Sequence, residues 1–437
     1  MDVRQLRTLY RTLRHGLALM RVKPSSSWTF VDTIEKQVAA RGDHPLVLFE
    51  DRRVSYNEYN ALANRIAHWA LESGIRSGDV VALLMQNRPE YLAAWAGLAK
   101  AGITTALLNT NLTGRTLGHA IEAAGTRRLL VGSECLPNYE SLGADAPEGL
   151  EVHVAADPAT ASAIPLPPGA LDFESELASR STQNPDPSVR AEVHSGDPLV
   201  LIYTSGTTGL PKAAKMSHLR FSMTGIGSQI AGFGRSDVMY CALPLYHSAG
   251  GGMAVSAVLR SGGTIALRRR FSASAFWDDV RLFQATAFQY IGEFCRYLVI
   301  QPQSDDDGAH AIEFAIGNGL RPDIWEEFQN RFRIPQVVEF YGATEANVAM
   351  LNFDNKHGSC GKRPPAVVPQ PRLIRYDVES DTHVRDAGGL CIECAPDEVG
   401  ELVGEIPQKA DTLQGRFEGY TSKAETERKI LRDVRSK

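Results

Sequence analysis

The sequence predicts an α/β protein with mainly parallel sheets, followed by a smaller β-rich part. Apolar runs of strand length alternate with helical periodicity across residues 28–142, and the same alternation returns across residues 197–345. Such alternation is typical of parallel sheets whose two faces are covered by helices. With 437 residues the chain is also too long for one ordinary core, so we expect at least two subdomains.

In the first stretch, strands and helices are expected in turn. The expected elements are strands at 46–49 and 80–84, helices at 56–72 and 90–101, and a strand at 104–108. Ser55, followed three residues later by Glu58, forms a candidate capping box for the first of these helices. Residues 143–196 are rich in Ala, Pro, Ser and Asp, which predicts loop and irregular connection.

These patterns suggest how the chain is divided. The expected parts are a basic N-terminal helix over 1–27, α/β subdomains over 28–196 and 197–345, and a small β-rich subdomain over 346–437 with a last helix at 423–434. Glycine, proline and short β-like runs dominate the last part, which is why a small β subdomain is expected there.

The N-terminal segment has the pattern of an amphipathic helix. Leu6, Leu9, Leu13, Leu17 and Met20 recur at helical spacing, and arginines occupy mostly other faces. Two interpretations remain open: the helix lies on an anionic membrane surface, or it docks on its own domain with its arginines in water. No run is long and apolar enough to span a bilayer, and a secretory signal pattern is missing.

Composition narrows the class of protein. The net charge of −5 is small for this length, so no nucleic-acid partner is expected. Six scattered cysteines fit a reducing cytoplasm better than a disulfide framework. Cys391 and Cys394 have CxxC spacing, but without a second pair to complete a zinc site we interpret them as positions in a β-rich segment. We expect a cytoplasmic protein, peripheral at the inner face of the cell membrane if its helix binds lipid.

The segment Tyr203-Thr-Ser-Gly-Thr-Thr-Gly-Leu-Pro-Lys212 is the densest chemical pattern in the chain. The apolar run 199–202 before it predicts a buried strand, and the residues after it are expected to open a helix. Glycines let a backbone approach phosphate oxygens, loop N–H groups can form an anion-binding nest, and Lys212 adds a positive charge. The order differs from the Walker pattern, which places a glycine directly before the lysine. A Ser/Thr/Gly-rich turn with no ligand is the structural alternative.

Three further segments carry candidate ligand groups. His247 follows an expected strand and precedes a glycine-rich loop at 248–252, which we expect to be flexible. The Gly-Asn-Gly turn at 317–319 exposes backbone groups. Tyr341 offers a flat ring for stacking on a purine, and Glu345 offers the carboxylate oxygens that Mg²⁺ takes. Each residue alone also has a purely structural interpretation.

Taken together, these segments resemble a known family. The decapeptide and Tyr341-Gly-Ala-Thr-Glu345 resemble the two main signatures of the adenylate-forming enzymes, the acyl-CoA synthetase superfamily. The segments that resemble its very-long-chain acyl-CoA synthetase and fatty acid transport protein branch are Asn87-Arg-Pro-Glu-Tyr91, Leu108-Asn-Thr-Asn-Leu112, 316–328 and Lys429-Ile-Leu-Arg-Asp-Val434. The resemblance covers about Trp28 to Val434. Ala346 departs from it, because glycine is usual there.

The resemblance implies the large N-terminal domain of the adenylate-forming fold and a set of site residues. The implied catalytic residues are Lys212, His247, Thr344 and Glu345. The implied nucleotide-binding residues are Tyr203, Thr204, Ser205, Gly206, Thr207, Thr208, Gly209, Lys212, Gly317, Asn318, Gly319, Tyr341, Gly342 and Thr344. Thr204 and Glu345 are implied ligands of Mg²⁺.

The same resemblance implies ATP-dependent activation of long- or very-long-chain fatty acids. The carboxylate attacks the α-phosphorus to give acyl-adenylate, and coenzyme A then takes the acyl group. Two alternatives remain: a ligase that passes acyl-adenylate to a carrier protein, and an inactive lipid-binding or transport module. The family's later Gly-Asp motif and C-terminal domain are not found in this sequence. We therefore expect impaired turnover, or a C-terminal domain supplied by a separate polypeptide.

Overall fold

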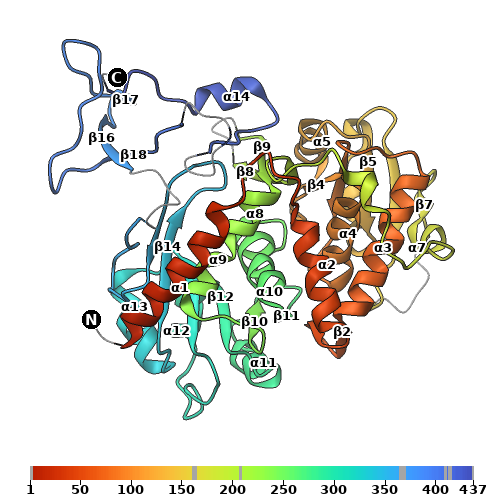
Figure 1. The fold of residues 1–437 in the computed structure, drawn as a ribbon, viewed down its shortest axis with the longest axis horizontal. Coiled ribbons are helices and arrows are strands. Elements are labelled where there is room, and N and C mark those ends of the chain that lie inside the picture. Colours follow the sequence, from red (N-terminus) through yellow and green to blue (C-terminus); the bar gives the residue numbers. More distant parts are fainter. Residues whose placement is uncertain are drawn as a thin grey trace.

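Two large α/β sheets and one small sheet make up the fold. The computed structural model describes residues 3–159, 165–205, 209–363, 371–407, 411 and 416–435. In Figure 1 the two large sheets and their helices lie side by side, and the small sheet projects at one end, close to the C-terminus. The expected α/β class with mainly parallel sheets is confirmed.

A seven-stranded sheet is built mostly from the first half of the chain. Its order is β7 (Leu171–Asp172), β6 (Glu151–Ala155), β5 (Arg128–Gly132), β3 (Val80–Leu84), β4 (Thr104–Leu107), β8 (Pro198–Ser205) and β9 (Pro211–Ser217). Neighbouring strands are parallel except for the edge pair of β8 and β9. The carboxyl end of β8 therefore pairs with the start of β9, with Ser205 opposite Pro211.

An eight-stranded sheet holds the second half. Its order is β15 (Ala349–Asn352), β14 (Val337–Gly342), β13 (Phe314–Asn318), β12 (Ala287–Ile291), β10 (Val238–Cys241), β11 (Thr264–Leu267), β1 (Pro45–Phe49) and β2 (Arg52–Ser55). Only the two edge pairs, β15 with β14 and β2 with β1, are antiparallel. The third sheet contains β16 (Arg372–Asp377), β17 (Thr382–His383) and β18 (Gly400–Val403).

Helices connect the strands and cover the large sheets. They are α1 (Val3–Met20), α2 (Phe30–Arg41), α3 (Tyr56–Glu72), α4 (Pro89–Lys100), α5 (Gly114–Ala123), α6 (Leu136–Glu140), α7 (Phe173–Leu177), α8 (His218–Thr224), α9 (Ile226–Ala231), α10 (Val255–Ser261), α11 (Phe276–Leu282), α12 (Gly292–Val299), α13 (Pro322–Arg331) and α14 (Lys423–Arg428). Short 3₁₀ turns η1 (Ser133–Cys135), η2 (Gly143–Asp145) and η3 (Pro187–Arg190) and a π-helix, η4 (Ser248–Ala254), complete the set. Among the residues so described, no helix is both long and apolar enough to cross a membrane.

The predicted boundary at residue 196 does not separate the strands of the two large sheets. The strands β1 and β2 come from before that point and belong to the eight-stranded sheet, where Val47 pairs with Ile265. In the other direction, β8 and β9 come from after it and complete the seven-stranded sheet, where Val200 pairs with Thr105. Likewise β15 lies beyond residue 345 but edges the eight-stranded sheet. Apolar runs identify strands, but they do not say which sheet each strand joins.

The capping pattern predicted from the sequence at Ser55 is confirmed, whereas two other predictions for single segments are not. The Ser55 hydroxyl accepts the N–H of Glu58 at 3.2 Å, and the Glu58 carboxylate accepts the N–H of Ser55 at 2.7 Å, so the capping box of α3 is present. The expectation of loop for 143–196 is wrong in part, because this segment contains β6. The polar His153 hides that strand in the sequence, yet it is buried between carboxylates of Glu151 and Glu176. The last helix is also shorter than expected, because α14 ends at Arg428.

The largest apolar core takes side chains from both large sheets. Val47 and Ile265 come from the eight-stranded sheet, and Leu83 and Val200 come from the seven-stranded sheet. The helices α2, α3, α4, α8 and α10 also contribute side chains to this core. The two sheets are therefore joined through one continuous apolar interior.

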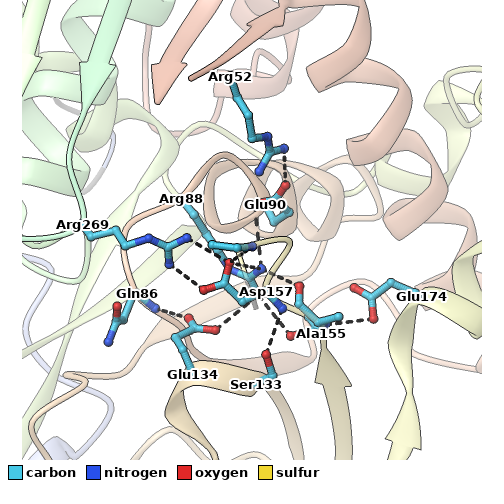
Figure 2. Close-up of polar contacts among 12 residues, drawn as sticks. Arg52, Gln86, Arg88, Glu90, Ser133, Glu134, Ala155, Asp157, Glu174 and Arg269 are labelled. Carbon is cyan, nitrogen blue, oxygen red and sulfur yellow. Dashed lines mark hydrogen bonds and ion pairs between the residues drawn. The ribbon is translucent and has the colours of Figure 1, made fainter. Parts of the chain in front are cut away.

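A buried polar network links the two sheets as well (Figure 2). Arg88, at the start of α4, is fully buried and donates to the carbonyls of Ala155 at 3.1 Å and Ala156 at 2.6 Å. Arg269 follows β11 in the eight-stranded sheet and forms a two-pronged pair with Asp157, at 2.7 and 2.9 Å, just beyond β6 of the other sheet. Charge-assisted bidentate contacts of this kind fix geometry as well as distance.

Candidate nucleotide-binding and active site

The segment Tyr203–Lys212 forms the hairpin between β8 and β9. Thr204 pairs with Lys212 across the two strands. The expected helix after the loop is wrong, because the strand β9 follows and α8 begins only at His218. Gly209 has φ +79°, a conformation that favours glycine. Predicted nucleotide-binding residues that lie outside the described part of the chain are Gly206, Thr207, Thr208 and the side chain of Ser205.

Tyr203 points away from this loop. Its ring is buried in the core beneath α5, and its hydroxyl donates to the carbonyl of Ala120 at 2.6 Å. Burial raises the pKa of the phenol. The side chain therefore supports the loop from below, and only its backbone lies at the hairpin.

The Lys212 side chain meets α14. Its ammonium group forms an ion pair with the carboxylate of Glu425, and it lies 6.0 Å from the ring centre of Tyr420. The segment before α14 runs along β9: the N–H of Lys215 donates to the carbonyl of Gly419 at 3.0 Å, and the N–H of Thr421 donates to Ala213 at 3.0 Å. The C-terminal segment is thus held against the hairpin by backbone hydrogen bonds.

The second signature begins at the end of β14. The Tyr341 ring is 46% exposed, so it has a free face beside the loop 343–346. Within this loop the Thr344 hydroxyl donates to that of Ser248 at 3.1 Å. Arg220 of α8 fixes the loop by donating to the carbonyl of Ala343 at 3.2 Å and to that of Ala346.

Arg220 is a desolvated cation beneath the second signature. Burial lowers its pKa, while the carboxylates of Glu418 and Glu345 act in the opposite direction. A guanidinium stays charged even when its pKa is lowered, so it supplies a fixed positive charge next to this loop. The same charge would favour anionic groups at Thr344 and Glu345.

Tyr420 lies near both Thr204 and Glu345. Its pKa is raised, chiefly by burial, and both residues act on the phenol. The Thr204 hydroxyl oxygen is buried and has no hydrogen-bond partner within the described part of the chain. Glu345 also faces Lys429, whose ammonium nitrogen lies 3.5 Å from a carboxylate oxygen. One hydroxyl and one carboxylate are hard oxygen donors of the kind Mg²⁺ takes when substrate phosphates complete its shell. In the described part of the chain, no cluster of three or more His, Cys, Asp or Glu side chains forms a separate metal site.

The turn at 317–319 is built around a buried acid. The Glu339 carboxylate accepts the N–H of Gly319, and the Tyr290 hydroxyl donates to it at 2.5 Å. Burial raises the pKa of Glu339. A Cβ on Gly317 would lie 2.2 Å from the carbonyl oxygen of Tyr290, so only glycine fits this approach. Asn318, at the end of β13, pairs with Ile291 of β12 in the same register.

His247 lies at the entrance to the π-helix η4. Desolvation by neighbouring groups lowers the pKa of the imidazole, which favours its neutral form, although the residue itself is solvent-exposed. Its ring packs edge-on against Tyr246 with centroids 4.6 Å apart. The expected flexible loop is wrong: residues 248–254 are wound tightly, and a Cβ on Gly251 would lie 1.8 Å from the carbonyl oxygen of Leu245. Gly250 and Gly251 are needed for this close packing.

Asn87 holds the strand end that leads to His247. Its amide donates to the carbonyls of Leu243 at 2.8 Å and Arg268 at 2.9 Å, and it accepts the N–H of Leu245 at 2.8 Å. One side chain makes all three contacts, and it comes from the part of the chain that builds the seven-stranded sheet. Asn87 therefore fixes the position of the His247 turn relative to the seven-stranded sheet.

An apolar cavity of about 260 Å³ opens from the second signature. Tyr341, Gly342 and Thr344 line it at one end, together with Ser248. Thr12 and Gly16 of α1 line it elsewhere. The apolar side chains that form most of its wall are Met216, Met223, Ile230, Phe340, Val348 and Leu351. The structure thus joins the predicted nucleotide motif to an apolar space.

Sequence reasoning missed several residues of this site. Glu339 had a signal, since a carboxylate in the apolar strand Val337–Gly342 is unusual unless it is paired. Arg220, Glu425 and Lys429 gave no such signal in the sequence. A charged residue in or next to a short helix looks the same in sequence whether or not it contacts a distant loop. Tyr420 reaches Thr204 and Glu345 only through the pairing of its segment with β9.

Comparison with known proteins agrees with this geometry. Residues 34–405 match the family described as AMP-binding enzyme. Long-chain fatty acid transport protein 1 of Homo sapiens is 41% identical over 390 residues, which cover 88% of this chain and 59% of that protein. The medium/long-chain-fatty-acid–CoA ligase FadD6 of Mycobacterium tuberculosis is 33% identical over 427 residues, covering 97% of this chain and 67% of that one. The chain thus spans less than two thirds of the length of the fatty acid transport protein it matches.

Solved structures share the fold. A benzoate CoA ligase from Burkholderia xenovorans LB400 superposes with a TM-score of 0.74 at 18% identity, covering 93% of this chain and 76% of that chain. The N-terminal domain of FACL13 from Mycobacterium tuberculosis superposes with a TM-score of 0.72 at 20% identity, covering 93% and 95%. The match over residues 34–405 and the second signature at the end of an apolar cavity lead to the same conclusion: this chain belongs to the AMP-binding enzyme family.

Proposed function

We propose that this chain activates long-chain carboxylic acids with ATP, giving acyl-adenylate and pyrophosphate. The cavity that runs from Thr344 and Ser248 into an apolar wall carries the proposal. A carboxylate at the polar end would lie beside the phosphate-binding groups, while its hydrocarbon tail fills the apolar part. Each buried methylene contributes about 0.8 kcal/mol, so such a space favours long tails.

In this proposal the carboxylate oxygen attacks the α-phosphorus of ATP and pyrophosphate leaves. Lys212 and the backbone N–H groups of the β8–β9 hairpin bind phosphate oxygens, where negative charge builds in the transition state. Thr344 orients the α-phosphate, and Arg220 holds its loop from behind. Thr204 and Glu345 would hold Mg²⁺, which would neutralise charge on the phosphates. The neutral His247 can donate a ring N–H to the substrate carboxylate without binding it as an ion pair.

The nucleoside is assigned to the other side of the second signature. Tyr341 stacks on the adenine, and the backbone at Gly317, Asn318, Gly319 and Gly342 surrounds its edge. Support comes from Glu339, which rigidly fixes the 317–319 turn. A turn fixed before the ligand arrives loses little entropy on binding.

We assign coenzyme A as the acyl acceptor because one relative is named a fatty-acid–CoA ligase. The long-chain fatty acid as substrate rests on the names of that relative and of the transport protein. The thiolation step is assigned to the part of those relatives that lies beyond the matched length, whether on the same or on a separate polypeptide.

A second candidate is lipid binding without turnover. The ion pairs of Lys212 with Glu425 and of Glu345 with Lys429 favour it, because both engage the groups that would bind phosphate and metal. The two candidate functions differ in whether pyrophosphate is released. Fatty acid binding without release of pyrophosphate would support this second function.

The test combines product analysis with a variant. The protein is incubated with ATP, Mg²⁺, coenzyme A and palmitate, and acyl-AMP, acyl-CoA and pyrophosphate are measured by mass spectrometry and a coupled assay. Glu345→Ala is expected to weaken Mg²⁺-dependent ATP binding and adenylation, whereas Glu327→Ala, on the exposed surface of α13, leaves both unchanged. Wild-type ATP affinity and Mg²⁺ dependence in Glu345→Ala would contradict the metal assignment. Acyl-AMP absent from the wild-type reaction would contradict the activity itself.

We also propose that α1 rests on an anionic membrane surface. Leu6, Leu9, Tyr10 and Leu13 are exposed along one side of the helix, and Arg7 and Arg14 are exposed beside them. An apolar stripe flanked by arginines suits the boundary between acyl chains and acidic headgroups. Sedimentation with phosphatidylglycerol vesicles checks this, and equal binding to neutral phosphatidylcholine vesicles would contradict the role of charge.

A further inference from the structure

Helix α1 docks on the protein through Arg11. Figure 1 shows α1 running across the molecule beside α9. The guanidinium of Arg11 donates to the carbonyl of Ala231, at the end of α9, at 3.1 Å. Gly232 has φ +130°, and a Cβ there would lie 2.8 Å from a guanidinium nitrogen of Arg11. The absent side chain at Gly232 therefore leaves the space that Arg11 occupies. The predicted Leu17 and Met20 have side chains outside the described part of the chain.

The face of α1 that turns toward the cavity carries Thr12 and Gly16. These residues are one helical turn apart and both line the cavity. The Thr12 hydroxyl donates to the carbonyl of Thr8 at 2.8 Å, so it brings no unpaired polar group to the cavity. A Cβ built on Gly16 meets no atom within 4 Å among the residues whose side chains the structure describes. The wall supplied by α1 thus has a gap at Gly16, where a side chain would have room.

An apolar surface leads outward from this gap. Leu9, Leu13 and Gly16 follow one another as i, i+4 and i+7, so they lie along the same side of the helix. Leu9 is 47% exposed and Leu13 is 55% exposed. The gap at Gly16 is therefore continuous with a strip of leucine surface on the outside of the protein.

The size of the cavity makes this gap matter. Its volume of about 260 Å³ lies below the roughly 300 Å³ at which pockets for drug-sized ligands begin. A long hydrocarbon tail whose carboxylate lies at Thr344 outgrows that space. The part of the tail beyond the cavity needs an opening, and the wall offers one at the residue without a side chain.

We propose that Gly16 determines the acyl-chain length this protein accepts. The distal part of a long tail passes beneath α1 at Gly16 and lies along Leu9 and Leu13, whereas a short tail stays inside the cavity. This inference rests on the proposed function, because it takes the carboxylate end of the ligand to lie at Thr344. It assigns chain-length specificity to a helix that lies outside both nucleotide signatures.

The test is a comparison of chain lengths in Gly16→Trp and Gly16→Leu. Binding of radiolabelled octanoate, laurate and palmitate to the full 437-residue chain is measured by equilibrium dialysis. One buried methylene is worth about fourfold in Kd, so excluding two of them weakens binding by more than tenfold. We expect Gly16→Trp to weaken palmitate roughly tenfold or more and to leave octanoate within about twofold. The palmitate affinity of Gly16→Leu is expected to lie between those of Gly16→Trp and the wild type.

Glu327→Trp is the matched control, because it places the same ring on an exposed helix surface, on α13, that does not line the cavity. It is expected to bind all three acids as the wild type does. Glycine is a poor helix former, so replacing it inside α1 favours the helix, and thermal unfolding checks that each variant is folded.

Two outcomes would overturn the role of Gly16. One is unchanged palmitate binding in Gly16→Trp, and the other is an equal loss for octanoate and palmitate. Failure of the wild type to bind any of the three acids is a different result, because it refutes the proposed function and the length selection with it.

Discussion

Replacing Arg88 by methionine is expected to lower the free energy of unfolding by about 3 kcal/mol, the low end of the range for breaking a buried ion pair. The side chain is fully buried and donates to two backbone carbonyls. Its guanidinium lies 3.6 Å from Glu134 and 4.0 Å from Asp157. Asp157 keeps its two-pronged pair with Arg269, so the charge left with the least compensation is that of Glu134.

Urea unfolding measures this loss, with the midpoint compared at an unchanged slope. Arg52→Met is the control from the same network, because Arg52 pairs with Glu90 at 2.6 Å but is partly exposed. Exposed pairs contribute about 0–1 kcal/mol. Adding Glu134→Gln to Arg88→Met removes the stranded charge and is expected to recover part of the loss, with a coupling on the order of 1 kcal/mol. A loss in Arg88→Met no larger than that in Arg52→Met, or no recovery in the double variant, would refute the reasoning.

Two further predictions concern protons and phosphate. Burial lowers the pKa of His218 to about 4, and its ring nitrogen accepts the N–H of Phe30 at 3.1 Å. Below pH 6.5 this histidine is therefore protonated in the unfolded chain but stays neutral in the folded protein. As the pH falls toward 4, the free energy of unfolding drops by up to about 3 kcal/mol. His218→Asn keeps the acceptor without the titration, so urea midpoints of the two proteins should converge over that range; a constant difference would contradict this. Glu425→Gln frees Lys212 from its ion pair and is expected to tighten ATP binding about fivefold by calorimetry, corresponding to ~1 kcal/mol. Glu427→Gln, on the exposed side of α14, is its control, and equal affinities in the two variants would show that the pair does not compete with ATP.

Elements with a strong local pattern were predictable. The capping box at Ser55 and the apolar runs of β1 and β3 appear where the sequence places them. The short strand β6 was not predictable, because His153 interrupts its apolar pattern and is buried by pairing with two carboxylates, one of them on Glu176 of α7. The helix expected after Lys212 was wrong because pairing with β8 decides the structure of that segment, and pairing is not a local property.

The candidate site divides in the same way. The contiguous motif Tyr341–Glu345 was recognisable from the sequence, and Tyr341, Gly342 and Thr344 of it line one end of the cavity. The partners that surround them, such as Arg220 and Tyr420, come from segments far away in the chain. The role of α1 was left between two interpretations. Docking through Arg11 and exposure of the leucine side both occur, since they concern different faces of one helix.

The exchange of strands between the two sheets has a consequence for synthesis of the protein. β1 is made early, but its parallel partner β11 is made roughly two hundred residues later. At about 5–20 residues per second, a ribosome needs roughly 10–40 s to supply that partner. During this interval the apolar run Pro45–Phe49 has only its hairpin with β2 to cover it. The nascent chain therefore carries an unpaired, aggregation-prone edge for about half of its translation, which makes it a natural client for chaperones that bind extended apolar segments.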